Sequence, residues 1–322
     1  MKGQNNMNEM KQILTKIKEH QKIVIYGHIR PDGDCYGSQF GLKEIIKSTF
    51  PQKEVYVTGQ TSGYVSFIGK MDIVSDEFCQ EALSIVVDTG APNRISDKRY
   101  LTGKEIIKID HHISEVAHYG HINWVIEEKP ACSEMVFDFY RINKLKISLK
   151  GAIALYTGIV TDTGGFRYRG VTKSTFETAG DLVGLGVDVE YVNNELSRTT
   201  FNELELRGYF LNNIHKSNHF LYVKIPMEVY ENFGVSSEDA AALVNQLAGI
   251  EGYPVWAIII EYANKEYRVR MRSTGIPITK IAQKYRGGGH EYACGATLNT
   301  WDECEQLAKD VDELVEKITN GN

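Results

Sequence analysis

Residues 22–34 read KIVIYGHIRPDGD, and residues 105–112 read EIIKIDHH. Each stretch begins with a short run rich in Ile and Val, which predicts a buried β-strand, and continues directly into His and Asp. Residues 84–88, SIVVD, repeat the pattern with a single Asp, and the apolar stretch 154–161 is followed by Asp162. Open α/β sheets bind their ligands at the carboxyl ends of the strands. We therefore expect these four segments to bring their His and Asp side chains together at one sheet edge.

The first 190 residues alternate between strand-like and helix-like patterns. The expected strands cover residues 22–27, 54–59, 84–88 and 105–110. Helical spacing appears in residues 38–50 and 175–188, and residues 133–140 predict a further helix with Ser133 as its N-cap. This alternation is typical of βαβ units. For residues 1–190 we expect an α/β domain with a largely parallel sheet flanked by helices.

The pattern changes after residue 190. Residues 191–213 are polar, helical in period and poor in strand-forming residues, which predicts a helical linker. Strand-like runs then return, and an amphipathic helix is predicted over residues 301–318. The strands expected in this part cover residues 220–226, 253–263 and 266–273. Residues 214–322 are therefore expected to form a second, smaller α/β domain.

The composition excludes several classes of protein. The chain has 322 residues, 42% hydrophobic and 24% charged, as in an ordinary globular protein. No stretch approaches the roughly 20 apolar residues that cross a membrane, so we expect no membrane association. The five cysteines are scattered without a CxxC pair, which favours a reduced, cytoplasmic compartment. A net charge of −6 argues against non-specific duplex binding through a broad basic surface.

The His and Asp residues can also be explained without a metal. A single Asp after a strand, such as Asp88, most often caps a helix or forms a turn. Several carboxylates gathered at one edge, however, would repel each other unless cations neutralised them. Oxygen and nitrogen donors with no cysteine among them favour a hard or borderline divalent metal. We therefore expect a pair of metals that share one carboxylate, and Asp88 is the candidate for the shared ligand.

Residues 262–290 are basic, with seven Lys or Arg against one acid. In a strand, the two-residue period would place on one face Arg268, Arg270 and Arg272. A solvated edge strand explains such a face equally well. The glycines of the following GGGH, residues 287–290, let backbone N–H groups approach an anion, which favours a loop that binds phosphate. Together the two features favour a segment that binds phosphate, and because Arg can also stack on a base, such a segment suits single-stranded ligands.

In order and spacing, the HxxPDxD segment, the isolated Asp88, Asp110-His111-His112 and the TDTG segment resemble the DHH phosphoesterase superfamily. The resemblance implies one metal held by His28, Asp32 and Asp88. It implies a second metal held by Asp34, Asp88, His111 and Asp162. In this superfamily the metals are usually Mn²⁺, so the expected cofactor is two Mn²⁺, with Mg²⁺ or Co²⁺ as substitutes. His112 would face the scissile phosphate, and Asp110 would orient the imidazoles.

The second half resembles the DHH-associated C-terminal domain, through RMRS at residues 270–273, the GGGH and Ala293-Cys294-Gly295. The substrate-binding residues implied are Arg268, Arg272, Ser273, Gly287, Gly288, Gly289 and His290. The whole chain resembles the group of bifunctional oligoribonucleases and pAp phosphatases, the nano-RNases. The resemblance implies an Mn-dependent exoribonuclease that degrades single-stranded RNA of about two to five nucleotides and converts adenosine 3′,5′-bisphosphate (pAp) to AMP.

Other functions remain open. A phosphodiesterase for cyclic di-AMP or linear pApA would use the same residues, so only relative turnover would separate it from a nano-RNase. A nucleotide sensor with a dead site is disfavoured by the intact set of acids and histidines. Ser133-Glu134 also matches the nano-RNase pattern, although a helix cap is the preferred role for Ser133. The resemblance is compatible with a homodimer, whose interface the sequence does not identify.

Overall fold

The structure is a computed structural model that describes residues 2–112, 119–168 and 170–320. The chain divides into two compact units, Met1–Arg198 and Thr199–Asn322. This division falls within the expected linker, residues 191–213. The helix α7 (Val189–Leu196) belongs to the first unit and α8 (Phe201–Asn212) to the second. Leu206 and Phe210 of α8 are buried in a core of the second unit, so α8 is a structural part of that unit.

The first unit contains a parallel sheet of five strands in the order β2-β1-β3-β4-β5. The strands are β1 (Lys22–Tyr26), β2 (Glu54–Thr58), β3 (Leu83–Val87), β4 (Glu105–Asp110) and β5 (Ile122–Val125). Four of them match the predicted runs, while β5 was not predicted. The expected α/β domain with a largely parallel sheet is confirmed. Its central strands are rich in β-branched residues and buried on both faces, as in parallel sheets generally.

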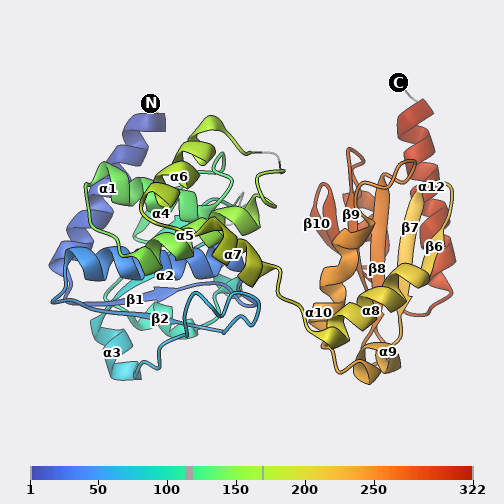
Figure 1. Cartoon of the computed structure of the whole chain (residues 1–322), viewed down its shortest axis with the longest axis horizontal. Coiled ribbons are helices and arrows are strands. Elements are labelled where there is room, and N and C mark those ends of the chain that lie inside the picture. Colours follow the sequence, from blue (N-terminus) through green and yellow to red (C-terminus); the bar gives the residue numbers. More distant parts are fainter. Residues whose placement is uncertain (1, 113–118, 169, 321–322) are drawn as a thin grey trace. The chain divides into compact units, whose positions relative to one another are not determined.

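Helices cover both faces of this sheet (Figure 1). One core joins strand residues such as Ile23 and Ile25 to helices α1 (Lys2–Glu19), α2 (Gly33–Thr49), α4 (Cys132–Ile142) and α5 (Leu149–Asp162). The helix α6 (Lys173–Gly184) packs beside α5. The alternate residues, Val24 and Tyr26, face a second core with α3 (Asp76–Glu81) and the 3-10 helix Lys98–Thr102. Alternate side chains of each strand therefore contribute to the cores on the two faces of the sheet.

The apolar stretch before Asp162 is not a strand. It belongs to α5, so only three of the four segments end at the sheet edge, and the expectation is corrected for this one. Helix α5 packs closely on α2, where a Cβ at Gly37 would lie 2.5 Å from the carbonyl oxygen of Ala154. A buried helix and a buried strand are both apolar throughout, so periodicity could not separate them. The close helix pair still brings Asp162, at the last turn of α5, toward the first turn of α2.

The second unit contains a mixed sheet of six strands in the order β10-β11-β9-β8-β7-β6, in which β7 and β8 alone are parallel. The strands are β6 (Ile214–Lys216), β7 (Phe220–Ile225), β8 (Val255–Glu261), β9 (Tyr267–Ser273), β10 (Gly288–His290) and β11 (Ala293–Leu298). Helices α11 (Thr279–Lys284) and α12 (Glu303–Asn320) share a core with one face. Helices α8, α9 (Met227–Asn232) and α10 (Ser237–Ala242) share a core with part of the other. A second, smaller α/β domain is confirmed.

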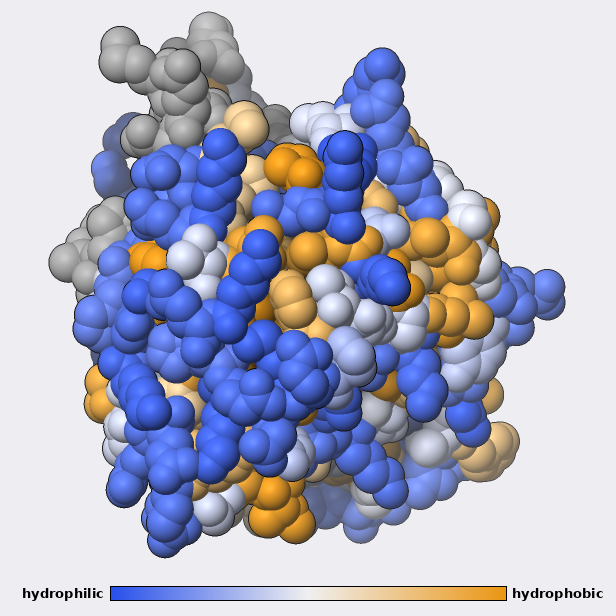
Figure 2. Space-filling model, turned by 90° about the vertical axis from the view of Figure 1, so that its left-hand side faces the viewer, coloured by the Kyte–Doolittle hydropathy of each residue, from blue (hydrophilic) through white to orange (hydrophobic). Residues whose placement is uncertain are grey.

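The surface is mostly polar where Figure 2 shows it. In that view hydrophilic side chains dominate, and hydrophobic ones gather in small groups between them (Figure 2). Among the residues that the structure describes, no helix combines the length and the apolar character needed to cross a membrane.

Candidate active site

Three neighbouring strands carry the predicted residues at their carboxyl ends. His28 follows β1, Asp88 follows β3, and Asp110 ends β4 with His111 and His112 next in the chain. The strand order reverses at β1, because β2 lies on one side of it and β3 on the other. In open α/β sheets the crevice at such a reversal is where ligands bind. The topology thus places these side chains at the position that favours a ligand site.

His28 presents a lone pair to two carboxylates. Its Nε2 lies 3.7 Å from Asp32 Oδ2 and 3.6 Å from Asp88 Oδ2. Its Nδ1 lies 2.9 Å from the carbonyl oxygen of Ile29, which can only accept a hydrogen bond, so Nδ1 carries the proton of the neutral ring. Asp32 is fixed as well, because its Oδ1 accepts two backbone N–H groups as the N-cap of α2. Oδ2 of Asp32 is left facing the imidazole.

His111 repeats this arrangement with a second set of carboxylates. Its Nε2 lies 3.3 Å from Asp88 Oδ1, 3.3 Å from Asp162 Oδ2 and 3.7 Å from Asp34 Oδ2. Its Nδ1 lies 2.9 Å from the carbonyl oxygen of Lys129, which assigns the proton to Nδ1 in the neutral ring. A metal-ligating His typically donates a hydrogen bond from one ring nitrogen to a carbonyl, which leaves the lone pair of the other nitrogen to bind the metal.

Asp88 lies between the two imidazoles. Oδ2 faces His28 and Oδ1 faces His111, and the side chain is almost fully buried. Within the described residues, Oδ1 accepts no hydrogen bond. The backbone of Asp88 is left-handed, with φ of 50°, which is uncommon for a non-glycine residue and costs free energy unless the surroundings fix it. A single carboxylate therefore faces both groups, as a shared ligand would.

Asp34 is held by the first turn of another helix. Its oxygens accept the backbone N–H groups of Cys132, at 2.6 Å, and Ser133, at 2.8 Å. The N-cap of α4 is Ala131, which makes no side-chain cap, so the prediction that Ser133 caps this helix is wrong. Asp34 supplies the missing acceptor from α2, and the Ser133 hydroxyl lies 3.1 Å from that of Ser38 instead. A carboxylate from a distant segment has replaced the local cap.

The cluster needs positive charge. Carboxylates that face ring lone pairs repel them unless a proton or a cation lies between. Burial and the neighbouring carboxylates raise the pKa of Asp162 to about 9 and of Asp34 to about 7. Burial lowers the pKa of His111, but the carboxylates around its Nε2, with Asp88 first, outweigh it and raise the pKa to about 11. A divalent cation would displace these protons, and together with the orphaned oxygen of Asp88 this donor set fits a metal.

Three groups of residues that could hold a metal meet here, each with ligand atoms within 4.8 Å of one another. The groups are His28, Cys35 and Asp88; Asp88, His111 and His112; and Asp34, His111 and Asp162. Cys35 falls within the first group, although we expected no cysteine among the donors. Its buried sulfur accepts the backbone N–H of His28 at 3.3 Å.

His112 is the most exposed of the three imidazoles. Its side chain is 39% exposed, against 9% for His28 and 14% for His111. Nδ1 of His112 lies 2.8 Å from Oδ1 of the fully buried Asp110, and this hydrogen bond raises the pKa of the ring. Oδ2 of Asp110 lies 3.0 Å from Nζ of Lys108. Asp110 thus orients His112, and Nε2, on the opposite edge of the ring, is left for a ligand.

In the second unit, the basic strand is not a sheet edge. β9 lies between β11 and β8, so the explanation by a solvated edge strand is wrong. The expected GGGH loop is corrected too, because Gly288–His290 form β10, paired with β11. The strand register gathers arginines and small residues on one face. We call this the arginine–glycine face, and it comprises Arg270, Arg272, Gly288, His290, Ala293 and Gly295.

The arginine–glycine face is open above its glycines. A Cβ at Gly288 would meet nothing within 4 Å, and one at Gly295 would meet only a backbone oxygen, at 3.7 Å. Arg272, Ala293 and His290 form one row across three strands, since Arg272 pairs with Ala293 and Ala293 with His290. Paired residues of antiparallel strands point to the same side. The side chains of Arg272 and His290 therefore lie on either side of Ala293, next to Gly288 and Gly295. We call these three small residues the floor of the face.

Two other predicted side chains of this unit have partners of their own. Arg268 lies on the same face of β9 as Arg272 but four residues away; it pairs with Glu266 at 3.1 Å and lies over the ring of Tyr262. Ser273 points to the opposite face from Arg272, and its hydroxyl donates to the carbonyl oxygen of Ile276.

The outer two glycines of the predicted run serve the hairpin. A Cβ at Gly287 would lie 2.0 Å from the carbonyl oxygen of Gly295, and Gly289 has φ of 142°. Of the three glycines at residues 287–289, only Gly288 lies on the arginine–glycine face.

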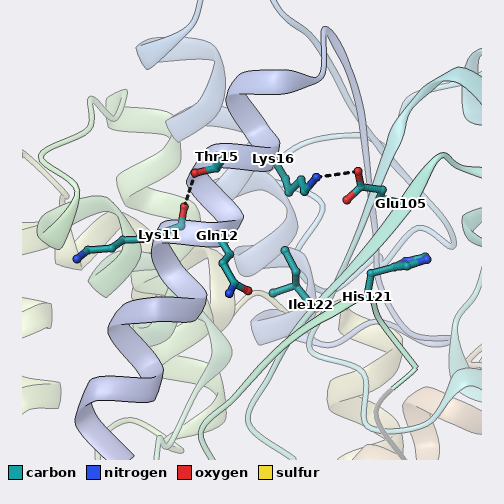
Figure 3. Close-up of a pocket in the computed structure, with 7 residues that line it drawn as sticks. All are labelled: Lys11, Gln12, Thr15, Lys16, Glu105, His121 and Ile122. Carbon is teal, nitrogen blue, oxygen red and sulfur yellow. Dashed lines mark hydrogen bonds and ion pairs between the residues drawn. The ribbon is translucent and has the colours of Figure 1, made fainter.

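A separate pocket of about 390 Å³ lies at the other end of the first sheet. α1 supplies Lys11, Gln12, Thr15 and Lys16 to it, while β4 and β5 supply Glu105 and Ile122 beside His121 (Figure 3). Lys16 reaches across it to Glu105 at 2.9 Å. Glu105 begins β4, whereas Asp110 ends it, so the pocket contains none of the clustered His and Asp residues.

Comparison with known proteins assigns both units. Residues 22–159 match the model of the DHH family, N-terminal domain, and residues 217–317 match the DHHA1 domain. The probable bifunctional oligoribonuclease and PAP phosphatase NrnA of Streptococcus mutans is 38% identical over 96% of this chain and 100% of its own length. The bifunctional oligoribonuclease and PAP phosphatase NrnA of Bacillus subtilis is 36% identical, over 94% and 97%.

More distant proteins share the architecture. An exopolyphosphatase-related protein from Bacteroides fragilis has a crystal structure that matches with a TM-score of 0.86 and 25% identity, over 97% of this chain and 96% of its own. The cyclic-di-AMP phosphodiesterase GdpP of Geobacillus thermodenitrificans is 25% identical over 91% of this chain but only 47% of its own length. The chain thus belongs to the DHH family with a DHHA1 domain, and over nearly its full length it resembles the relatives named bifunctional oligoribonuclease and PAP phosphatase.

Proposed function

We propose that this protein is a metal-dependent phosphoesterase that degrades short single-stranded RNA to mononucleotides and converts pAp to AMP. The observation that carries the proposal is Asp88, whose two oxygens face two separate imidazole–carboxylate groups. The full-length similarity to proteins named for both activities supports the same choice of substrates.

The proposed ligands divide into two sets that share Asp88. His28 and Asp32 complete one set, and Asp34, His111 and Asp162 complete the other. Carboxylate oxygens and imidazoles suit Mn²⁺, with Mg²⁺ or Co²⁺ as substitutes. When bound, such metals lower the pKa of water and neutralise charge on a phosphoryl group. The carboxylates make this site anionic, which favours divalent ions.

His112 is proposed to act on the phosphate. Asp110 fixes the Nδ1 edge of the ring, so the exposed Nε2 edge can approach a phosphoryl or leaving oxygen. The hydrogen bond to Asp110 raises the pKa of His112, which favours the protonated ring. A protonated imidazole can stabilise negative charge that develops on the phosphoryl group and can give a proton to the leaving group.

The nucleotide is proposed to bind at the second unit. Arg272 and His290 lie in one row beside the open floor at Gly288 and Gly295. A guanidinium can bind phosphate bidentately or stack on a base, and a flat floor accepts either. A role in substrate binding stays a prediction for Arg268, Ser273, Gly287 and Gly289. The structure gives these residues other contacts: Arg268 and Ser273 have partners of their own, and the two glycines fit the hairpin.

The alternative is a phosphodiesterase for cyclic di-AMP or linear pApA. The same ligands and the same arginine–glycine face would serve it, and a relative with that name covers most of this chain. We rank it second because that relative matches over less than half of its own length, whereas the nano-RNase relatives match throughout.

Substrate comparison tests the proposal. Purified protein with Mn²⁺ should release mononucleotides from 5′-phosphorylated RNA dimers to pentamers and convert pAp, and EDTA should stop both reactions. Faster turnover of cyclic di-AMP than of either substrate would establish the alternative. Hydrolysis of none of these phosphoesters would refute the proposed function.

Location and assembly are part of the proposal. Cys35, Cys79, Cys132, Cys294 and Cys304 are all buried and free, as in proteins of a reducing compartment, so we propose a cytoplasmic protein. A homodimer is a further prediction, to be tested by light scattering of the purified chain.

A further inference from the structure

Lys108 is a buried cation next to the proposed site, and it has no part in the function proposed above. It lies on β4 two residues before Asp110, so both side chains point to the same face of the sheet. Lys108 and Asp110 are almost fully buried. A buried lysine is costly unless it is paired and hydrogen-bonded, so its partners indicate why it is there.

Nζ of Lys108 is fixed from three sides. It lies 3.0 Å from Asp110 Oδ2, donates to the carbonyl oxygen of Gly90 at 3.1 Å and stands over the ring of Tyr119 at 4.9 Å. The hydroxyl of Tyr119 in turn donates to the carbonyl oxygen of Thr89 at 2.8 Å. Thr89 and Gly90 form the turn that follows the left-handed Asp88. Lys108 thus connects the loop after β3 with the end of β4.

The two oxygens of Asp110 have different partners. Oδ2 forms an ion pair with Lys108, and Oδ1 accepts a hydrogen bond from Nδ1 of His112. We propose that Lys108 is a positioning residue for the reaction, because through Asp110 it sets the orientation of His112. This inference rests on the proposed function, because it assigns Lys108 to the phosphoester hydrolysis that His112 serves.

The main test compares two buried lysines of the same unit. Lys108→Met removes the ammonium but keeps most of the apolar stem. Lys53→Met is the matched control, because Nζ of Lys53 is also buried but bonds the carbonyl oxygens of Lys18 and His20, away from the His and Asp cluster. With an RNA dimer and pAp, we expect kcat of Lys108→Met to fall roughly 100-fold, the size of an acid–base contribution. KM, bound metal and the kinetics of Lys53→Met should stay near wild type.

A double-mutant cycle separates positioning from general stabilisation. If Lys108 acts through His112, Lys108→Met should cause little further loss of kcat in a His112→Ala background. Losses that multiply, an unchanged kcat in Lys108→Met, or an equal loss in Lys53→Met would overturn the inference. Should Lys108→Met fail to fold, Tyr119→Leu replaces it, because this variant loosens Nζ but leaves both buried charges paired; its smaller loss must also vanish in the His112→Ala background.

A readout without turnover keeps this test independent of the proposed function. The Nδ1 proton of His112, sheltered by Asp110, should give a downfield proton NMR signal in wild type and in Lys53→Met. It should exchange away in Lys108→Met. If wild type cleaves no phosphoester but shows this pattern, the proposed function fails and the positioning of His112 stands. A signal that is equal in all three proteins would overturn the role of Lys108.

Discussion

At the scale of single residues, Asp88 is the one that both imidazole groups require. Its oxygens lie 3.6 Å from Nε2 of His28 and 3.3 Å from Nε2 of His111. Asp88→Asn keeps the size but replaces one oxygen with an NH₂ group, which cannot bind a cation. We expect kcat to fall at least about 100-fold and metal content to drop, as measured by kinetics and by elemental analysis. Full metal content in an inactive variant would contradict the shared-ligand assignment.

Arg272 and Arg268 provide a matched pair on one strand. Arg272 lies in the row of His290, whereas Arg268 is four residues away and paired with Glu266. Arg272→Ala should therefore raise KM for pAp about 10-fold or more, as expected for the loss of a hydrogen-bonded charge contact. Arg268→Ala should change KM little. Equal effects of the two variants would show that the whole strand, rather than one row, binds the nucleotide.

Sequence predicted the residues whose position depends on a local pattern. His28, Asp32, Asp88 and His111 follow strands, and strand ends of a parallel sheet meet at one edge. The supporting contacts come from other elements and were not predictable. Asp34 replaces the local cap of α4, and Lys108 reads in the sequence as one polar residue inside a strand.

At the scale of elements, long runs with a clear period were predicted and short or uniform ones were not. β5 is four residues long, and its core contact comes mainly from Trp124, so its run gave little signal. α5 is buried almost continuously over residues 151–160, where it packs on α2 and α4, so it shows little helical period. β10 consists of two glycines and a histidine, residues that seldom form strands, and it exists because β11 pairs with it.

Gly288 in β10 and Gly287 just before it allow a prediction at this scale. A Cβ at Gly287 would lie 2.0 Å from the carbonyl oxygen of Gly295, so Gly287→Ala should destabilise the second unit by about 1–3 kcal/mol. Gly288→Ala meets no atom within 4 Å and should leave the free energy of unfolding nearly unchanged, while raising KM because the new methyl occupies the open face. Urea unfolding and steady-state kinetics measure both effects. Destabilisation by Gly288→Ala equal to that by Gly287→Ala would contradict the assigned orientation of β10.

At the scale of the whole molecule, the chain combines two units with different chemistry. The first concentrates buried carboxylates and imidazoles at one sheet edge, and the second presents arginines beside glycines. Each property depends on tertiary packing, since burial is what shifts the acids from their ordinary pKa values. The stability of the whole chain should therefore report on the site through pH and metal.

In the metal-free protein the pKa values of Asp34 and Asp162 are about 7 and about 9, above the ordinary 3.8. An acid whose pKa is raised by folding stabilises the fold fully below its unfolded pKa, and this contribution is lost as pH rises through the folded pKa. The raised pKa of His111, about 11, acts in the same direction above pH 6.5. We therefore expect the Tm of metal-free protein to fall by several degrees between pH 5 and 9, because in this range the unfolded chain has already released protons that the folded acids still bind. Mn²⁺ competes with these same protons, so its stabilising effect should grow over that pH range.

Thermal unfolding with EDTA or Mn²⁺ measures both trends, and Asp88→Asn should lose most of the metal effect. A Tm independent of pH, or an equal Mn²⁺ effect at both ends of the range, would show that the cluster does not exchange protons for metal.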